Sequence, residues 1–194
     1  YSSLTRQPEA QLPKVSATIG ALIAQTAQRL ETEAVIHRLA QVDEMTELDN
    51  RAYFYAQLNR HCAQSHRQGR RFALVFIDLD RFKPINDAFG HEAGNAVLQE
   101  FARRLRALAP PPARVGRLGG DEFAVLVPDS SDDTALAALV DAMLAAASRP
   151  IVHDGATLTV SASIGVSRFP DNGQTGPELL RSADAAMYLS LIHI

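Results

Sequence analysis

The sequence contains a single cysteine, Cys62, among 194 residues. This excludes a disulfide framework within the chain and a zinc site built from several thiolates. Basic residues are not in excess either, because 19 Lys and Arg stand against 22 Asp and Glu, for a formal net charge of −3. A nucleic-acid coat or a polybasic membrane binder needs an excess of positive charge, so we expect no nucleic-acid partner.

Long apolar runs are also missing. No stretch approaches the roughly 18 apolar residues of a membrane-spanning helix, and the first residues lack the pattern of a signal peptide. We therefore expect a cytoplasmic protein with no membrane segment in this chain. Because the sequence begins at Tyr1 rather than Met, we expect the natural protein to extend further, and a membrane tether outside these residues stays open.

The composition that remains, 46% hydrophobic and 21% charged, is ordinary for a globular protein of one full domain plus a fragment. Residues 1–41 form the fragment. Pro8 and Pro13 predict a loop over 1–16, and apolar residues partly at helical spacing predict a helix over 16–41. Two interpretations of this helix stay open: an amphipathic helix packed on a neighbouring domain, or one chain of a parallel dimeric coiled coil.

Residues 42–188 alternate between helical and strand patterns. The run 72–79 is almost continuously apolar and ends in a carboxylate, which predicts a buried central strand. The predicted elements are, in order, helix 50–68, strand 72–79, helix 93–108, strands 114–118 and 123–127, helix 134–147, strand 157–166 and helix 176–188. Apart from the leading helix, the order is β-α-β-β-α-β. It predicts an α+β, ferredoxin-like fold with helices on one face of an antiparallel sheet.

The last six residues, 189–194, fit poorly with the helix predicted before them. They are also the peptide that a common sequencing-library adaptor encodes in this reading frame. We therefore expect residues 189–194 to be a non-native tail, with the natural chain continuing differently after Tyr188. A genuine short apolar tail is the alternative.

Two acidic clusters are the candidates for chemistry. Asp78 ends the buried strand, with Asp80 two residues later, and Asp121 and Glu122 follow the glycines of the predicted hairpin. In a ferredoxin-like sheet the first strand lies beside this hairpin, so Asp78 and Asp121 can converge. Converging carboxylates repel unless a cation lies between them, and oxygen ligands of this kind suit Mg²⁺ or Mn²⁺. The alternative is solvated acids beside an ordinary turn.

The residues around these clusters form a known set. Gly119-Gly120-Asp121-Glu122-Phe123 is the signature of the GGDEF domain, found in the diguanylate cyclases. Residues 43–51 resemble the family motif D-x-L-T-x-L-x-N-R, and residues 76–91 resemble F-x-D-x-D-x-F-K-x-x-N-D-x-x-G-H. Residues 163–166 and 183–188 are similar to the late blocks of the family. The resemblance therefore covers residues 42–188 and implies a GGDEF catalytic domain with a fold like the palm of nucleotide polymerases and cyclases.

This resemblance implies an enzyme that condenses two GTP into cyclic di-GMP and releases two pyrophosphates. Each domain holds one GTP, so a homodimer is implied for catalysis. On the family pattern, Mg²⁺ (or Mn²⁺) would be held by the side chains of Asp78 and Asp121 and by the backbone carbonyl of Leu79. Asp121 and Glu122 would be the catalytic carboxylates. Whether Asp121 accepts the proton of the attacking hydroxyl or mainly positions that hydroxyl stays open.

The resemblance also implies the substrate-binding residues. Asn86 and Asn95 match positions that contact guanine and ribose; the family most often has Asp at the second, so guanine selectivity is expected to be softer here. The other implied substrate contacts are Phe82, Lys83, His91, Gly119 and Gly120. For Phe82, plain packing is an equally good interpretation. The two glycines lack Cβ atoms, so a phosphate chain can approach the backbone closely.

Two departures from the family pattern concern regulation and activity. Product-inhibited members carry an R-x-x-D motif at the positions of residues 110–113, which here are Pro-Pro-Pro-Ala. We therefore expect no product inhibition through that site. After the Met-Tyr pair the family has a Lys and then an Arg directed toward the phosphates, whereas this chain has residues 189–194. We expect the truncated C-terminus to impair activity.

Residues 14–33 resemble, more loosely, the last helix of a GAF sensor domain that continues into a signalling linker. This implies that residues 1–41 are the remnant of a truncated sensor that sets how two catalytic domains face each other. Two other functions compete with the enzyme. One is a catalytically inactive GGDEF domain that binds GTP as a regulatory module, and the other is a dimerisation scaffold. The intact signature and strand-end Asp favour the enzyme.

Overall fold

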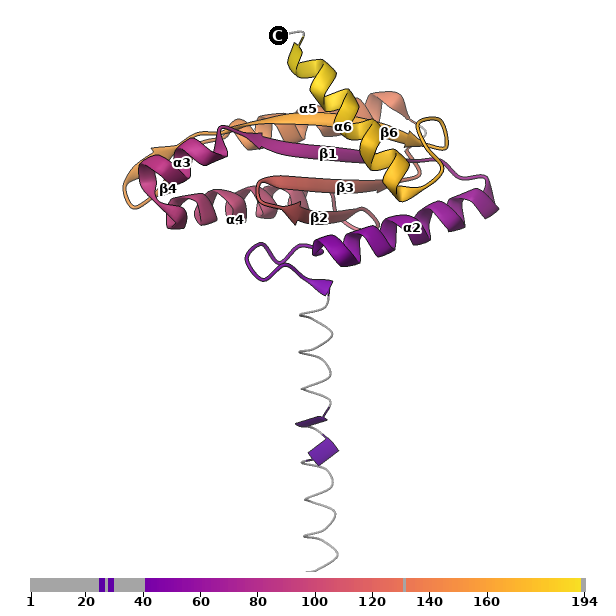
Figure 1. The fold of residues 1–194 in the computed structure, drawn as a ribbon, viewed down its shortest axis with the longest axis horizontal. Helices are drawn as coiled ribbons and strands as arrows, with labels where there is room; N and C mark the ends of the chain where they lie inside the picture. Colours follow the sequence, from indigo (N-terminus) through magenta and orange to yellow (C-terminus); the bar gives the residue numbers. More distant parts are fainter. Residues whose placement is uncertain (1–24, 27, 30–40, 131, 193–194) are drawn as a thin grey trace, which may run out of the picture. The chain divides into compact units, whose positions relative to one another are not determined.

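The computed structural model describes residues 25–26, 28–29, 41–130 and 132–192 (Figure 1). The chain divides into two units, residues 1–39 and residues 40–194. Residues 25–26 and 28–29 are helical, but most of the helix predicted over 16–41, with its sensor and coiled-coil interpretations, lies outside the described residues. Within the described residues, no helix is both long enough and apolar enough to cross a membrane.

The second unit has an α+β fold. In chain order its elements are α2 (Arg51–Gln68), β1 (Phe72–Asp80), α3 (Phe82–Phe89), α4 (His91–Leu108), β2 (Arg114–Gly119), β3 (Glu122–Pro128), α5 (Asp133–Ser148), β4 (Ile151–His153), β5 (Ala156–Leu158), β6 (Ser161–Phe169) and α6 (Gly176–Ile192). A four-stranded sheet has the order β2-β3-β1-β6, and every pairing in it is antiparallel. This confirms the predicted fold class and puts β1 beside β3.

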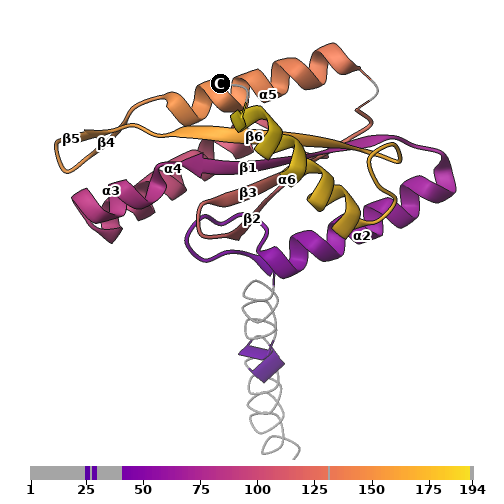
Figure 2. The same cartoon turned by 45° about the horizontal axis from the view of Figure 1, so that its top comes forward.

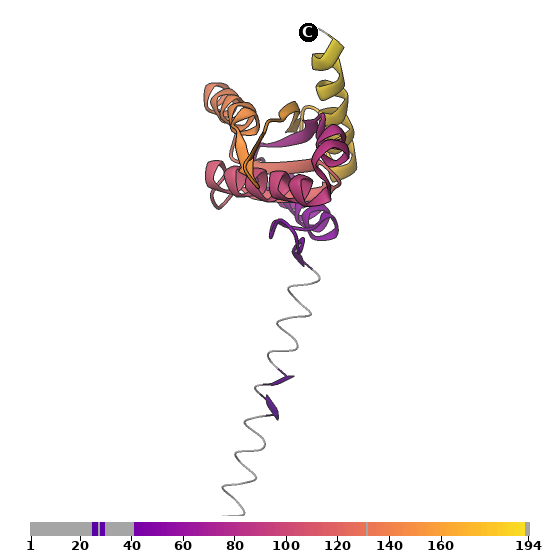
Figure 3. The same ribbon diagram turned by 90° about the vertical axis from the view of Figure 1, so that its left-hand side faces the viewer.

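Helices cover both faces of this sheet, so the prediction of helices on one face is wrong. Alternate residues of β1 point to opposite faces, and both sets are apolar. Ala73, Val75 and Ile77 join a core with α4 and α5, whereas Leu74 and Phe76 join a second core with α2 and α6. Figure 3 shows the sheet edge-on between these helices. A strand that is apolar on both faces must be covered on both faces. Helices α4 and α5 cover one face, and α2 and α6 cover the other.

Most predicted bounds are within two residues of those in the structure, and three parts of the fold differ by more. The helix α3 was not predicted; it contains Pro84, and proline is tolerated in the first turn of a helix. The predicted strand 157–166 is instead the end of a two-stranded ribbon, β4–β5, followed by the longer β6 (Figure 2). The backbone of α6 continues past Tyr188 to Ile192, four residues beyond the predicted end.

The helix α6 lies unusually close to the sheet at Gly165 of β6. A Cβ atom at this position would be 1.9 Å from the carbonyl oxygen of Ala183 and 2.6 Å from the backbone nitrogen of Met187. Only glycine allows this approach. The glycine of the 163–166 block is therefore needed for helix packing, which holds α6 against the face of the sheet that it shares with α2.

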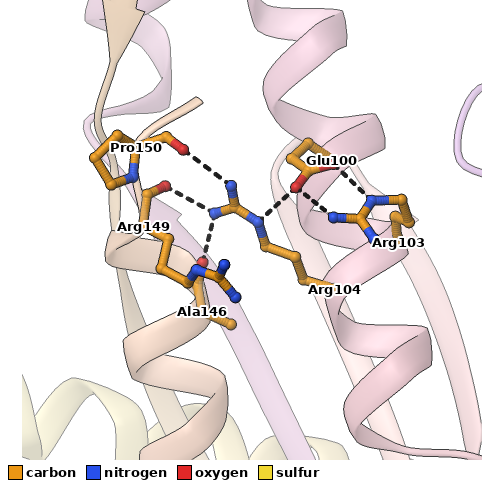
Figure 4. A network of polar contacts seen from close by, with 6 residues as sticks. All are labelled: Glu100, Arg103, Arg104, Ala146, Arg149 and Pro150. Carbon is orange, nitrogen blue, oxygen red and sulfur yellow. Dashed lines mark hydrogen bonds and ion pairs between the residues drawn. The ribbon is translucent and has the colours of Figure 1, made fainter. Parts of the chain in front are cut away.

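A buried arginine joins α4 to the end of α5 (Figure 4). Arg104 donates to the carbonyl oxygens of Ala146 and Arg149 at 2.7 Å and of Pro150 at 3.0 Å, and to the Glu100 carboxylate at 2.8 Å. Its side chain is 8% exposed. The carbonyls at a helix end have no partner within the helix, so Arg104 satisfies groups that burial would otherwise leave unpaired.

Replacing this arginine should destabilise the unit strongly. Arg104→Met keeps the apolar stem but leaves three carbonyl groups without their donor, so we expect the free energy of unfolding to fall by about 3 kcal/mol. Arg103→Met is the matched control, because Arg103 binds the same Glu100 while its side chain is 69% exposed. We expect it to change the free energy of unfolding far less than Arg104→Met does, because an exposed ion pair contributes little. Urea unfolding measures both, and equal losses would contradict this role of Arg104.

Candidate active site

The pairing of β1 with β3 brings the two acidic clusters together. Asp78 is the register partner of Glu122, and the backbone N–H of Leu79 donates to the carbonyl oxygen of Asp121 at 3.2 Å. Asp78, Asp121 and Glu122 are all partly buried. The structure therefore places the predicted metal-binding side chains on adjacent backbone segments at one end of the sheet, and Leu79, whose carbonyl is the third predicted ligand, follows Asp78 with its side chain buried in the core.

The electrostatics of this cluster are unfavourable for the carboxylates alone. The pKa of Asp78 is raised to about 6, first by burial and then by the negative charges of Asp121, Glu122, Asp80 and Asp184. The ionised form of Asp78 thus loses hydration and is repelled by four neighbouring carboxylates. A cation bound among these groups would reverse the sign of the local potential.

The donor set fits a hard divalent cation, with two carboxylates and a backbone carbonyl as oxygen ligands. Within the described residues, no three His, Cys, Asp or Glu side chains are grouped closely enough to hold a metal ion by themselves. Mg²⁺ usually keeps several waters and is bound through one or two carboxylates plus substrate phosphates. The residues present therefore suit a cation that arrives with a phosphorylated substrate.

Asp80 differs from Asp78 although both lie at the end of β1. Its two carboxylate oxygens accept hydrogen bonds from the hydroxyls of Ser161 and Ser163, each at 2.7 Å. Both serines belong to β6, so Asp80 fastens the end of β1 to its other neighbour. The described part of the chain shows no comparable donor for Asp78. The carboxylate of Asp80 thus already has hydrogen-bond donors, whereas the oxygens of Asp78 are available to a ligand.

The turn between β2 and β3 has a backbone that requires glycine. Gly120 has φ +51° and Gly119 has φ +150°, and the register shifts between Arg117 and Gly119. Non-glycine residues rarely adopt such values. Space is not the reason, because a Cβ atom at either glycine would meet nothing within 4 Å. The turn is therefore open to solvent, and a ligand could approach its backbone.

The predicted substrate residues Phe82, Lys83 and Asn86 lie on α3, and His91 and Asn95 lie on α4. A Cβ atom at Gly94 would be 1.9 Å from Oδ1 of Asn86 and 3.1 Å from Cζ of Phe82. The Asn86 amide therefore rests on the backbone of α4 at Gly94, the residue that precedes Asn95 in sequence. Lys83 and His91 are exposed. Because α3 starts two residues after Asp80, this group adjoins the acidic end of β1.

Arg117 of β2 also belongs to the site, and the sequence analysis missed it. Its guanidinium donates to the carbonyl oxygen of Gly120 and contacts the Asp43 carboxylate. Its place two residues before the glycines was the only available signal, since Asp43 lies 74 positions away.

The raised pKa of Asp78 predicts a pH-dependent stability. A carboxyl whose pKa is raised from 3.8 to about 6 on folding supports stability below about pH 4 that is lost as pH rises through about 6. Without divalent cations, Asp78→Asn should raise the free energy of unfolding at pH 7.5 by about 1 kcal/mol after solvent screening, with a smaller gain at pH 4.5. Urea unfolding at both pH values measures this.

Asp80→Asn is the control, because replacing one acceptor oxygen by an amide N–H disturbs the bonds from Ser161 and Ser163. It should lower stability at pH 7.5, in the opposite direction. A loss of stability in Asp78→Asn at pH 7.5 would show that the carboxylate is not under the repulsion described.

Comparison with known proteins identifies the family to which this chain is similar. A sequence profile described as "Diguanylate cyclase, GGDEF domain" matches residues 40–191. The chain is 36% identical over 193 residues to "Diguanylate cyclase TpbB" of Pseudomonas aeruginosa, covering 95% of this chain and 44% of that protein. It therefore spans less than half the length of this relative.

Solved structures to which the chain is similar include two from Caulobacter crescentus. A sensory box/GGDEF family protein from Caulobacter crescentus has a TM-score of 0.75 and 38% identity, covering 80% of this chain and all of that one. The coiled coil and GGDEF domain of DgcB from Caulobacter crescentus, in complex with c-di-GMP, has a TM-score of 0.84 and 27% identity, covering 92% and 95%. The paired β1 and β3, the glycine turn and the matched profile lead to one conclusion: this chain belongs to the diguanylate cyclase GGDEF domain family.

Proposed function

We propose that residues 42–188 are an active diguanylate cyclase domain that condenses two GTP into cyclic di-GMP and two pyrophosphates. The observation that carries this proposal is the register of β1 against β3, which puts Asp78 beside Asp121 and Glu122 and raises the pKa of Asp78. The family match supports synthesis of cyclic di-GMP in general. Carboxylates that repel one of their number, next to an open glycine turn, are what a site for a cation and a phosphate chain would require.

The side chains of Asp78 and Asp121 and the carbonyl of Leu79 would hold Mg²⁺ (or Mn²⁺). When bound, such a cation polarises phosphoryl oxygens and stabilises the attacking and leaving oxygens of a displacement. Asp121 is adjacent to the open turn and either accepts the proton of the attacking 3′-hydroxyl or orients that hydroxyl. Glu122, whose backbone pairs with that of Asp78, adds a second carboxylate next to that of Asp121.

The residues of α3 and α4 would bind the nucleotide. Asn86, whose amide rests on Gly94, and Asn95, the next residue of α4, would contact guanine and ribose. Asn95 offers one carbonyl acceptor where a carboxylate would accept from two guanine N–H groups, so selectivity for guanine is softer. The exposed Lys83 and His91 would meet the phosphates, and Phe82, packed on Gly94, would border the base.

Each domain would supply one GTP, so two copies must face each other, and a homodimer is the working unit. The 3′-hydroxyl of each nucleotide would then attack the α-phosphate of the other. The similarity to a structure containing a coiled coil and a GGDEF domain supports a helical linker before residue 42 that sets this arrangement. The location would be cytoplasmic, where GTP is available.

One observation favours a second candidate for the chain as it stands. The family's Lys and Arg after Tyr188 are replaced by residues 189–194, so contacts to the phosphates are lost. A domain that binds GTP as a regulatory module without cyclising it would tolerate this loss. Binding without turnover therefore distinguishes this candidate from the cyclase.

Incubation with GTP and Mg²⁺ tests the proposal, with cyclic di-GMP detected by mass spectrometry. The chain should form product, and a version carrying the C-terminal tail of TpbB in place of residues 189–194 should form it faster. Asp121→Ala should lower turnover by at least about 100-fold, because it removes a group at the reacting atoms.

The control for this substitution is Asp141→Ala, which removes an equally charged but exposed side chain from α5. It should leave turnover within about twofold, since surface substitutions away from the site have little effect. GTP binding without product in both tail versions would favour the regulatory module. Full turnover in Asp121→Ala would remove the metal and catalytic assignments.

Product inhibition gives a separate expectation. Residues 110–113 are Pro-Pro-Pro-Ala and supply neither the guanidinium nor the carboxylate of an R-x-x-D motif. Added cyclic di-GMP, at concentrations up to about 100 times that of the enzyme, should therefore change the initial rate by less than about twofold. Isothermal titration with cyclic di-GMP provides an independent check. Tight binding that persists when the catalytic site is filled with a GTP analogue would contradict this expectation.

A further inference from the structure

Arg117 lies at the centre of a cluster that we call the Arg117 clasp, made of Asp43, Met45, Arg117 and Gly120. The Nε and Nη2 atoms of Arg117 donate to the carbonyl oxygen of Gly120 at 3.0 and 2.8 Å. Its Nη1 atom contacts both carboxylate oxygens of Asp43 at 3.3 and 3.4 Å and the sulfur of Met45 at 3.5 Å. All three nitrogens of the guanidinium are therefore used, and the side chain is only 12% exposed.

The Asp43 end of the clasp is itself fixed. One carboxylate oxygen accepts from the backbone N–H of Thr46 at 2.9 Å and from its hydroxyl at 2.7 Å. Burial would raise the pKa of Asp43, yet the bonds from Thr46 and the charge of Arg117 lower it overall. Asp43 is therefore an ionised, oriented partner rather than a solvated surface acid. It positions the Arg117 guanidinium from the side away from the turn.

The Gly120 end of the clasp acts on the candidate active site. The carbonyl of Gly120 belongs to the peptide group that carries the N–H of Asp121, so fixing this carbonyl fixes the peptide plane before Asp121. The carbonyl of Asp121 is held on the other side by the N–H of Leu79. The two peptide groups that flank Asp121 thus each have one external anchor. Gly120, which precedes the first of these peptide groups, would otherwise have wide conformational freedom.

We propose that Arg117 is a positioning residue for the cyclisation reaction: it holds the Gly120 carbonyl so that Asp121 keeps the orientation that the reaction needs. This inference rests on the proposed function for its kinetic consequence, but not for its structural one. Because Asp43 lies three residues after Ala40, the first residue of the second unit, the orientation of Asp121 depends on the segment through which the chain enters the domain.

Arg117→Gln and Arg114→Gln form a matched pair for the test. Arg114 lies on the same strand and ties the same N-terminal segment to it, donating to both oxygens of Asp49 at 2.8 and 2.9 Å. The contacts of Arg114 do not include the Gly120 carbonyl. Both substitutions therefore remove an arginine–aspartate pair from β2, and only one removes the anchor of the turn.

The first measurement is amide hydrogen exchange of residues 119–122 without nucleotide or metal. In Arg117→Gln, the exchange rate at these amides should increase by about tenfold or more. The two hydrogen bonds to the Gly120 carbonyl, which must break when the turn opens, are then absent. In Arg114→Gln it should stay within about twofold. The second measurement is turnover of GTP with Mg²⁺. The kcat of Arg117→Gln should fall by about 10- to 100-fold, since small misplacements of a reacting group have effects of this size, while that of Arg114→Gln should stay within about threefold.

Two further variants keep the inference testable if Arg117→Gln does not fold. Asp43→Asn retains an oxygen for the two Thr46 bonds but removes the charge that holds Arg117, so exchange and kcat should shift in the same direction by a smaller factor. Arg117→Lys keeps one donor for the Gly120 carbonyl and should restore part of the kcat.

Equal effects of Arg117→Gln and Arg114→Gln on both measurements would overturn the inference, as would unchanged exchange at residues 119–122. The two proposals can fail separately. If the unmodified chain forms no cyclic di-GMP, the proposed function fails while hydrogen exchange still decides whether Arg117 anchors the turn. If it forms product and Arg117→Gln matches it in kcat, only the positioning role fails.

Discussion

The antiparallel pairing of β1 with β3 is the interaction on which the candidate active site depends. It fixes Asp78 opposite Glu122 and ties Leu79 to Asp121 through a backbone hydrogen bond. A slip of one residue would exchange the faces of every β1 side chain. Both faces are packed against helices, so a slip would disturb the two cores at once. The position of the acidic cluster is therefore enforced by the apolar residues along β1 that pack against both helical layers.

The same packing explains how the fold tolerates an unfavourable group of charges. Burial and four neighbouring carboxylates raise the pKa of Asp78, and nothing in this arrangement favours the folded state. The surrounding backbone is held by bonds of other kinds, such as those between Asp80 and the serines of β6. Strain of this type is typical of functional sites, where stability elsewhere offsets the local cost.

The sequence predicted most of the fold because its strongest signals are local. The apolar run of β1, the Gly119-Gly120 turn and the helix α4 all follow from neighbouring residues, and the signature turn identified the family. The second helical layer was missed because its position depends on distant contacts, although the two-sided apolar pattern of β1 already called for it. The Arg117 clasp was missed for the same reason, since 74 positions separate Arg117 from Asp43. The predicted site residues lie together, and their chemical roles remain predictions.

The charge of the site also constrains how the proposed substrate can bind. A triphosphate is strongly anionic, and it would enter a region where Asp78 is already repelled by four other carboxylates, those of Asp121, Glu122, Asp80 and Asp184. Lys83 provides a single exposed positive charge on α3, which in water is worth little against several negative charges. Nucleotide affinity in this domain should therefore depend chiefly on a divalent cation that neutralises carboxylates and phosphates together, and only weakly on Lys83. Because Asp78 must lose its proton to bind a cation, that affinity should decrease as pH falls below about 6.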